Sequence, residues 1–432
     1  MDAESIVKAL RLLGVEEYIV QVSEASVEQV RFSQNSKDLN SIWSEHVVSI
    51  LASVGSRVVS TSVQQHLVTE SYLEDLVRSL KASPENPNYM GIAPNSGDRS
   101  FVHEAHLDVD INDIADALVS GALEGGAQRA AGTVYRRDVL EETYTPGFHG
   151  KVRAVSLDMV VRAFRDGDTG QEQTHVGPEG TVDSRQAGAL GRRAGETASL
   201  SVPRKKGEEG RYTVLLSPHV LGNLMTYSEG FLSSYSVDTG LSCFIGMEGK
   251  EVASEAFSLW DVPQDRKGEG YTPFDDEGTE TRNRALIERG TLKTFMHSYS
   301  TGRKHGREST GNAGVLYPHA WQLQVGPGGR DHEKILDEIE NGIVIGNTWY
   351  TRFQDYRSGT FSTVPRDGVF LVRRGEIKER WEGMRISDSV PSILRNVIEA
   401  SSDMRYTRWW EEISASLMPY VLVDGLNISR GF

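Results

Sequence analysis

The segment between Asp275 and Gly314 places the strongest constraint on the fold, because its pattern predicts a β-hairpin between two glycine-containing loops. Leu286 and Ile287 precede a Glu-Arg-Gly turn, and Leu292 leads the apolar residues that follow it. Two short apolar runs joined by a turn that contains glycine are typical of paired strands. The segment therefore predicts β-structure in the second half of the chain.

The loops on either side of this hairpin combine glycine with side chains that form hydrogen bonds. Gly278 can adopt the positive φ of a tight turn, directly after three consecutive carboxylates, Asp275, Asp276 and Glu277. These carboxylates could serve acid–base chemistry, but their adjacency in a turn favours capping of backbone N–H groups. The small side chains from Gly311 to Gly314 allow another backbone to approach closely, although both segments could also be plain surface loops.

The chain of 432 residues is too long for one ordinary hydrophobic core, so two domains are expected. We place the boundary in the polar 203–210 segment, which gives an N-terminal domain over residues 1–200 and a C-terminal domain over residues 201–432. The first half mixes helical and strand-like patterns, whereas the second half is rich in short apolar runs between turns. The predicted fold class is therefore α+β, with a mixed α/β N-terminal domain and a β-rich C-terminal domain that has a few helices.

Apolar spacing and capping residues predict the individual elements. Predicted helices are 4–13, a helix with a capping box at Ser71 that stops near Pro84, 112–124 with Asp110 as its cap, 183–198, 218–232 and 391–400. Predicted strands are 18–22, 47–51, 58–59, 67–68, 134–143, 151–164, 212–216, 344–345 and 368–377. Gly188, Gly191 and Gly195 would weaken the 183–198 helix, so we expect them to allow close packing against a neighbour.

Charge and cysteine content restrict the classes of partner. The net charge of −15 opposes binding to nucleic acid, and the basic run Arg204–Lys206 is followed by Glu208 and Glu209, which indicates a solvated linker. No run of about 18 apolar residues predicts a membrane span, and the acidic N-terminus does not resemble a signal peptide. A single cysteine, Cys243, excludes an internal disulfide and a multi-cysteine metal site. We therefore expect a cytoplasmic protein.

The ordered set of motifs resembles the TldD/PmbA family, whose historical name is modulator of DNA gyrase. The resemblance rests on the Asp275–Gly314 segment, on the Gly-Met-Arg-Ile-Ser-Asp sequence that ends at Asp388, and on the Ile393–Val397 helix pattern. It covers most of the chain and is strongest between about residues 212 and 405. The gyrase name implies no contact with DNA, because the net charge opposes it.

Peptidase members of that family carry a His-Glu-x-x-x-His motif on a helix, in which two imidazoles hold a metal and the glutamate handles the proton of the attacking water. At the matching positions this chain has Ser217, Pro218 and Gly222. The cysteine ligand of the family is also missing, and the segment where it would fall contains Trp409 and Trp410. The resemblance therefore implies the metal-free PmbA/TldE-like branch, with no catalytic residue, metal ligand or cofactor in this chain.

The resemblance further implies a partner and a substrate. The partner would be a TldD-type zinc peptidase that forms a heterodimer around a chamber, although the chain could form a homodimer when alone. The complex would process or degrade unstructured polypeptides, and no nucleic acid or membrane would be involved. The residues that we expect to contact substrate are His219, His297, His305, Gly311, Asn312 and Gly314.

Two alternatives stay open at this point. The chain could be a hydrolase that acts alone through an unrecognised site near His219 or among His297, His305 and His319, or it could bind unfolded peptides without cutting them. A lone histidine beside a proline more often packs or caps than binds a metal, since zinc needs three or more protein ligands. His103 and His106 form a further histidine pair, but their spacing does not match the family motif.

Overall fold

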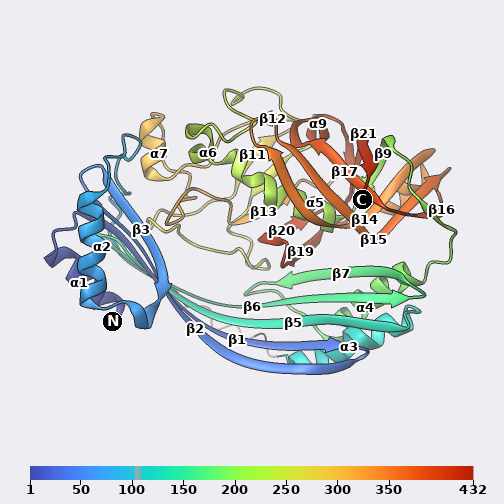
Figure 1. The fold of residues 1–432 in the computed structure, drawn as a ribbon, viewed down its shortest axis with the longest axis horizontal. Coiled ribbons are helices and arrows are strands. Elements are labelled where there is room, and N and C mark those ends of the chain that lie inside the picture. The colour runs from blue at the N-terminus through green and yellow to red at the C-terminus, as the bar shows by residue number, and fades with distance from the viewer. Residues whose placement is uncertain (103–106, 108, 432) are drawn as a thin grey trace.

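The structure is a computed structural model that describes residues 1–102, 107 and 109–431. Figure 1 shows a long curved sheet in the N-terminal half that bends around the C-terminal half. The C-terminal half contains two further sheets and most of the short helices. This arrangement confirms the α+β fold class, and no helix in the described part of the chain has the length and apolar character needed to cross a membrane.

The N-terminal sheet has seven strands in the order β3-β2-β1-β5-β6-β4, and β7 also pairs with β6. All of its pairs are antiparallel except β4 with β6. The strands are β1 Glu17–Ser33, β2 Ser36–Val54, β3 Arg57–Gln64, β4 Gly97–Val102, β5 Arg129–Tyr144, β6 Phe148–Arg165 and β7 Asp168–Val176. Their length lets one sheet contact helices on one face and the C-terminal half on the other.

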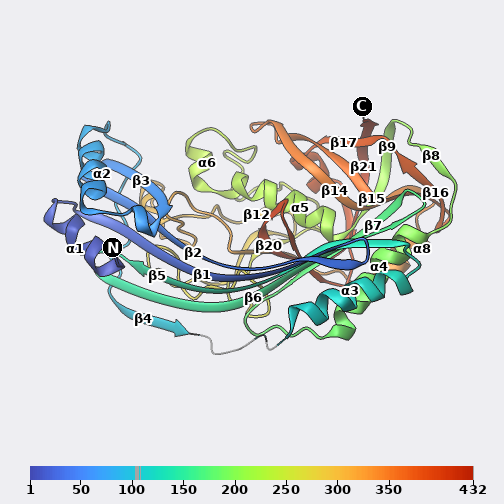
Figure 2. The same ribbon diagram turned by 60° about the horizontal axis from the view of Figure 1, so that its bottom comes forward.

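Two pairs of helices cover one face of this sheet, as Figure 2 shows at its two ends. Helices α1 (Ala3–Leu12) and α2 (Glu70–Ala82) bury apolar side chains of β1 and β2, such as Val20 and Ile50. Helices α3 (Ile111–Glu124) and α4 (Ser184–Ser199) bury the other ends of β1, β5 and β6. The buried residues alternate along each strand, so the intervening residues face the C-terminal half.

The close packing predicted for the glycines of α4 is confirmed at Gly191 and Gly195, whereas a Cβ atom at Gly188 would lie 3.6 Å from its nearest neighbour, the Ala117 oxygen. A Cβ atom at Gly191 would lie 2.1 Å from the carbonyl oxygen of Leu118, and one at Gly195 would lie 2.2 Å from that of Ala122. Both carbonyls belong to α3, so the two helix backbones are in direct contact. Only hydrogen fits at these two positions.

The C-terminal half contains a six-stranded sheet, β12-β11-β10-β13-β20-β19, and an eight-stranded sheet, β14-β9-β21-β17-β15-β16-β8, with β18 paired to β21. The strands are β8 Arg204–Lys206, β9 Gly210–Leu216, β10 Leu259–Asp261, β11 Arg284–Glu288, β12 Thr291–Leu292, β13 Gln322–Val325, β14 Asn341–Asp355, β15 Thr360–Arg373, β16 Glu376–Glu382, β17 Met384–Ser389, β18 Val397–Ala400, β19 Arg405–Trp409, β20 Glu412–Met418 and β21 Val421–Arg430. The helices are α5 Pro218–Ser228, α6 Ser234–Asp238, α7 Tyr299–Lys304, α8 His332–Asp337 and α9 Val390–Arg395. Helix α5 contributes to the large core that both sheets share.

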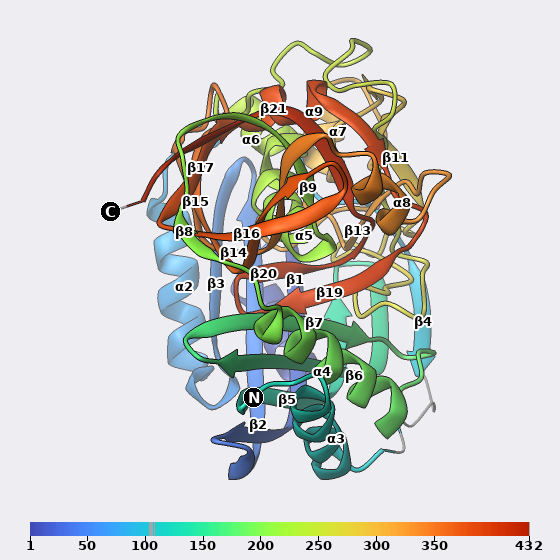
Figure 3. The same cartoon turned by 90° about the vertical axis from the view of Figure 1, so that its right-hand side faces the viewer.

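The contact between the two halves is visible in Figure 3, where β19 lies beside β7.

The predicted hairpin is confirmed, because β11 pairs with β12 through Arg289 and Gly290, which both have positive φ. The cap predicted for α3 is also confirmed, since Asp110 accepts a hydrogen bond from the Asn112 N–H. Asp183, which the prediction placed inside the 183–198 helix, is the N-cap of α4.

Some element predictions are wrong in detail. Gln65–Leu67 is a short 3-10 helix instead of a strand, and Thr69, not Ser71, caps α2, because the helix begins two residues earlier than the predicted box. The 203–210 segment contains β8, which pairs with β16 and is therefore not a free linker. The last predicted helix ends at Arg395, and the remainder pairs with β21 as β18.

Two further predicted elements have different bounds. The 218–232 helix is α-helical only to Ser228, and a 3-10 turn over Glu229–Leu232 continues it. The 368–377 strand is divided by a turn at Arg374 and Gly375, which both have positive φ and join β15 to β16.

Candidate functional site

Helix α5 and its N-cap carry the three positions at which the family resemblance places two histidine ligands and the glutamate between them. Ser217 is its N-cap, and the Oγ atom accepts a hydrogen bond from the Val220 N–H and donates one to the Gly346 carbonyl at 2.6 Å. Pro218 occupies the first turn, where its missing N–H has no consequence, and Gly222 is buried inside the helix. These side chains do not fit a zinc site, and among the described residues no group of three or more histidine, cysteine or acidic residues could hold a metal ion.

His219, the one imidazole on this helix, is buried in a network that joins the two halves. Its Nδ1 lies 2.9 Å from Thr407 Oγ1 on β19, and its Nε2 lies 3.6 Å from Glu172 Oε2 on β7. Glu172 also forms ion pairs with Arg193 of α4 and Arg405 of β19, each at 3.2 Å. Burial opposes ionisation of Glu172, but His219 and the two arginines outweigh it and lower the pKa of this carboxyl.

Three neighbouring cavities lie where the two halves meet, and we call them together the cleft. The first, which we call the tryptophan cavity, has a volume of about 760 Å³, the middle cavity about 400 Å³, and the hydroxyl cavity about 460 Å³. Arg408 lines both the tryptophan and the middle cavity, and Tyr317 and His319 line both the middle and the hydroxyl cavity. The tryptophan cavity borders β5, β6 and β7, the hydroxyl cavity borders β1, β2 and β3, and the middle cavity is lined by the C-terminal half.

The tryptophan cavity lies between the sheet and three indole rings. Trp409 is the last residue of β19, Trp410 follows it in the turn to β20, and Trp349 comes from β14. The centroids of Trp349 and Trp409 are 5.5 Å apart, and those of Trp409 and Trp410 are 5.2 Å apart. The sheet side is polar and is formed mainly by Tyr135, Arg137, Asp158, Arg162 and Gln171.

Ionised and protonated carboxyl groups lie close together where the tryptophan and middle cavities meet. Asp158 forms an ion pair with Arg137, and Glu269 forms one with Arg408. Burial and the charge of Glu269 raise the pKa of Asp158 to about 7. Burial also opposes ionisation of Glu269, but Arg408 outweighs it and lowers that pKa to about 2. The wall of the cleft can therefore hold a proton on Asp158 near neutral pH.

The hydroxyl cavity is lined by Ser49 of β2 and by Ser60, Thr61 and Ser62 of β3, opposite the carboxylate turn at 275–277. In that turn Asp275 accepts hydrogen bonds from the N–H groups of Glu277, Thr279 and Ala313. The backbone-capping interpretation of these carboxylates is thus confirmed.

The same turn attaches the C-terminal half to the sheet. Asp276 accepts a hydrogen bond from the Val315 N–H at 2.8 Å and another from the side-chain amide of Gln21 on β1 at 2.9 Å. Burial raises the pKa of Asp275 to about 7 and that of Asp276 to about 6, although the hydrogen bonds act in the opposite direction. The link across the cleft therefore depends on buried carboxyl groups.

The residues predicted to contact substrate occupy different layers. Gly314 lines the hydroxyl cavity. Asn312 lies buried behind it and donates hydrogen bonds to Asp261 and to the carbonyl of His319, and a Cβ atom at Gly311 would lie 2.8 Å from the carbonyl oxygen of Glu280. Asn312 therefore supports the cleft wall through its side-chain amide, and Gly311 does so through close contact of its backbone with residue 280.

The histidines of the prediction lie elsewhere. His297 and His305 have ring centroids 5.6 Å apart, and His305 pairs with Asp238 at 2.9 Å. Burial lowers the pKa of His297 to about 4, so its ring is neutral at physiological pH. His103 and His106 lie outside the described residues.

Sequence reasoning missed Trp349, Asp158, Glu269 and Arg408, because these residues come from four separate elements. The adjacent pair Trp409-Trp410 was a usable signal, because two consecutive indoles are difficult to bury together and an exposed indole favours contact with a ligand or a partner.

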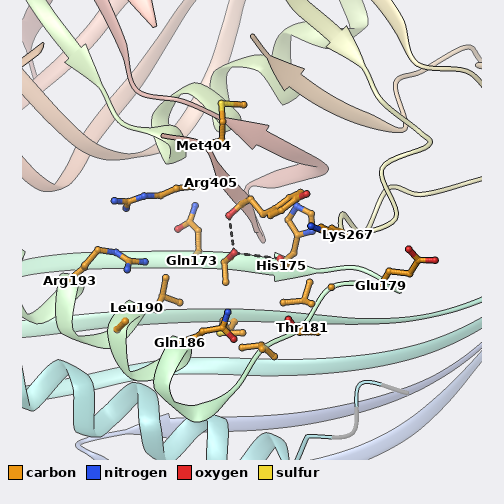
Figure 4. A pocket seen from close by; sticks show the side chains of 17 residues that line it. Gln173, His175, Glu179, Thr181, Gln186, Leu190, Arg193, Lys267, Met404 and Arg405 are labelled. Carbon is orange, nitrogen blue, oxygen red and sulfur yellow. Dashed lines mark hydrogen bonds between the residues drawn. The ribbon is translucent and has the colours of Figure 1, made fainter. Parts of the chain in front are cut away.

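A fourth cavity, of about 460 Å³, lies between β7, α4 and β19, and Figure 4 shows it with Arg193 and Arg405 at one side and Lys267 at the other. The Oγ1 atom of Thr174 donates a hydrogen bond to the carbonyl of Tyr406 beneath these side chains. Both arginines already pair with Glu172. This cavity shares no lining residue with the three cavities of the cleft.

Sequence comparison relates this chain to a family of metallopeptidases. Residues 209–430, more than half of the chain, match the family described as PmbA/TldA metallopeptidase C-terminal domain. Relatives include a metalloprotease of Methanothermobacter thermautotrophicus, 27% identical over 50% of this chain and 48% of its own length, and the metalloprotease PmbA of Escherichia coli O157:H7, 26% identical over 54% and 50%. The chain spans about half the length of the curated relatives that it matches.

Solved structures extend the likeness of fold to the whole chain. A Thermotoga maritima protein described as a modulator of a DNA gyrase superposes with a TM-score of 0.79 at 24% identity, with 99% of both chains covered. TldE of Thermococcus kodakarensis superposes with a TM-score of 0.78 at 16% identity, again over 99% of both chains. The sequence match over residues 209–430 establishes that this chain belongs to the PmbA/TldD metallopeptidase family.

Proposed function

We propose that this chain is the metal-free, TldE-like subunit of a two-subunit metallopeptidase that processes or degrades unstructured peptides. The observation that carries the proposal is the side-chain chemistry at α5. Ser217 and Gly222 stand at the two histidine positions of the family motif, and Pro218 stands at the glutamate position. The hydroxyl of Ser217 is already engaged by backbone groups, and the other two side chains offer no ligand atom. Zinc would then be held by a TldD-type partner in a heterodimer, and this chain would supply part of the substrate chamber.

The cleft supports a role in holding extended polypeptide. Its three cavities have volumes of about 400 to 760 Å³, which is the size range of sites for small ligands, and neighbouring cavities share lining residues. A chain laid along these cavities can be held through its backbone and through a few side-chain pockets, which requires no fixed sequence. The net charge of −15 opposes a nucleic-acid ligand, and we expect the complex to act in the cytoplasm.

The direct test is a reconstitution with a TldD-type partner. We expect the mixture to cleave an unstructured polypeptide faster than the partner alone, this chain alone to be inactive, and EDTA to abolish the activity of the complex. Zinc analysis of the separated subunits should place the metal in the partner, because α5 offers no ligands.

Other outcomes would support the alternatives. One zinc per molecule of this chain, with EDTA-sensitive proteolysis in the absence of any partner, would show a peptidase that acts alone. Peptide binding without any gain in partner activity would indicate a binding protein that does not cut. A homodimer that fails to exchange with the partner would also contradict the proposed heterodimer.

A further inference from the structure

We infer that the tryptophan cavity is a specificity subsite that receives an aromatic side chain of an extended peptide. This inference rests on the proposed function and adds a substrate preference to it. The cavity is the largest of the three in the cleft, at about 760 Å³, and three of its lining side chains are indoles.

The three rings form an open aromatic surface instead of a closed stack. Trp349 and Trp409 are inclined by 51°, and Trp409 and Trp410 by 67°, so the rings do not stack face to face. Arg162 and Arg366 lie over the Trp349 ring and Trp409 is buried, so Trp410 offers the free ring surface. Trp410 is 64% exposed, although indole is the largest apolar side chain. Burial of this ring against an aromatic ligand side chain would remove apolar surface from water.

The backbone around the rings is fixed by a buried carboxylate. Tyr350, next to Trp349, has a φ of 61°, and its N–H donates to Glu411 Oε2 at 2.5 Å. The register of β14 against β15 shifts at this point, and such bulges redirect side chains. Glu411 directly follows Trp410, and its carbonyl accepts a hydrogen bond from Asn223 of α5. The backbone next to Trp349 and Trp410 is therefore held by a residue with positive φ and a buried network.

Polar side chains of the sheet line the cavity opposite the indoles, among them Tyr135, Asp158 and Gln171. The carbonyl and N–H groups of a peptide backbone beside the aromatic side chain can form hydrogen bonds with such groups.

Charge excludes a basic side chain from the same place. Arg137, Arg162 and Arg408 line the cavity, and each forms an ion pair with a carboxylate of the protein. A lysine or arginine side chain of a peptide would lie among three guanidinium groups that already have partners. The subsite should therefore prefer phenylalanine, tyrosine or tryptophan and reject cationic residues.

The test uses dye-labelled peptides of glycine, serine and asparagine that carry one guest residue, and it measures their affinity for the full chain and for its complex with a TldD-type partner by fluorescence anisotropy. The phenylalanine peptide should bind about tenfold more tightly than the alanine peptide, and the lysine peptide more weakly than alanine. Trp410→Ala should reduce the preference for phenylalanine to within about twofold, while affinity for the alanine peptide stays the same. Trp410 is exposed, so the variant should keep the wild-type melting temperature.

Two variants sharpen the result. Trp409→Phe keeps an aromatic ring of smaller area, so it should weaken binding of the phenylalanine peptide by about threefold only. Tyr356→Ala truncates an exposed aromatic residue that lines none of the three cavities of the cleft, and it should leave the preference unchanged.

Equal binding of all three peptides, or a preference that survives Trp410→Ala, would overturn the subsite and leave the proposed function standing. No binding of any peptide by the chain or the complex, together with no gain in partner activity, would overturn both.

Discussion

The layers on the two faces of the N-terminal sheet are stabilised in opposite ways. On one face, α4 lies against α3 through glycine, with backbone atoms in direct contact at Gly191 and Gly195. On the other face, the turn at Asp275 and Asp276 is held by buried carboxyl groups that accept hydrogen bonds from backbone and from Gln21.

The difference separates two kinds of stabilisation, one between helices α3 and α4 and the other between the sheet and the C-terminal half. Contact between glycines depends on shape and is independent of pH, because no group in it titrates. The carboxylate turn depends on groups whose ionisation is opposed by burial, so its stability must change with pH. The helices joined by the glycine contact cover one face of the sheet, and the carboxylate turn borders the cleft on the other face.

The largest effect is expected for Gly191→Ala. The new Cβ atom would lie 2.1 Å from the carbonyl oxygen of Leu118, and a backbone oxygen cannot move aside without separation of α3 from α4. We expect a loss of about 3 kcal/mol in the free energy of unfolding, measured by urea denaturation.

Gly188→Ala is the matched control on the same helix, because its Cβ would find only the Ala117 oxygen at 3.6 Å. The gain in helix propensity should make this variant more stable by up to about 1 kcal/mol. Equal losses for Gly188→Ala and Gly191→Ala would show that close approach of the helices is not the cause.

A smaller effect is expected for Asp275→Asn on the opposite face. Asparagine keeps one acceptor oxygen, but its amino group would face one of the N–H groups that Asp275 now binds, from Glu277, Thr279 or Ala313. One backbone donor would then be buried without an acceptor, at a cost of about 2 kcal/mol in urea denaturation.

Glu280→Gln serves as the control, since Glu280 is an exposed carboxylate five residues further along the chain. Its unfolding free energy should stay within about 0.5 kcal/mol of the wild type. A neutral result for Asp275→Asn would mean that the turn contributes little to the interface.

The smallest effect is a pH dependence confined to the carboxylate face. The pKa values of Asp275 and Asp276 are raised by burial to about 7 and about 6 in the folded protein, from 3.8. Their contribution to stability is therefore fully present below about pH 4 and is lost as pH rises through about 6 to 7. After correction for intrinsic exchange rates, the amides of Ala313 and Val315 should lose about 1 kcal/mol of protection in hydrogen exchange between pH 6 and pH 7.

The amides of α4 provide the internal reference for this measurement. Their protection should change by less than about 0.3 kcal/mol over the same pH range, because no titrating group lies in the glycine contact. A parallel loss at both faces would indicate that the two halves open together.

Much of the fold could be predicted because its signals are local. Asp110 and Asp183 mark the starts of α3 and α4, and the Arg289-Gly290 turn marks a hairpin, since caps and turns depend on neighbouring residues. The errors occurred where pairing partners far away decide the outcome: β8 and β18 are strands only because β16 and β21 lie beside them. Ser71 is not the N-cap of α2, because the helix begins at Glu70 and Thr69 accepts the hydrogen bond from the Tyr72 N–H.

Of the candidate site, only the missing metal ligands could be predicted from the sequence. Ser217, Pro218 and Gly222 can be recognised as unsuitable ligands from residue type, because ligand chemistry belongs to the side chain itself. The roles of Trp349, Asp158 and Glu269 could not be foreseen, since no local pattern brings residues so far apart in the chain to one cavity.

The sequence by itself determined that this chain lacks a histidine–glutamate zinc site on α5, and that glycine must bring α4 close to a neighbour, because both follow from what a side chain contains or omits. Only the tertiary structure decided that three tryptophans from two segments meet over Arg137 and Arg162, and that buried carboxyl groups attach the 275–277 turn to β1. The physical reason is that burial and proximity, which set pKa values and form cavities, are properties of the packed chain as a whole.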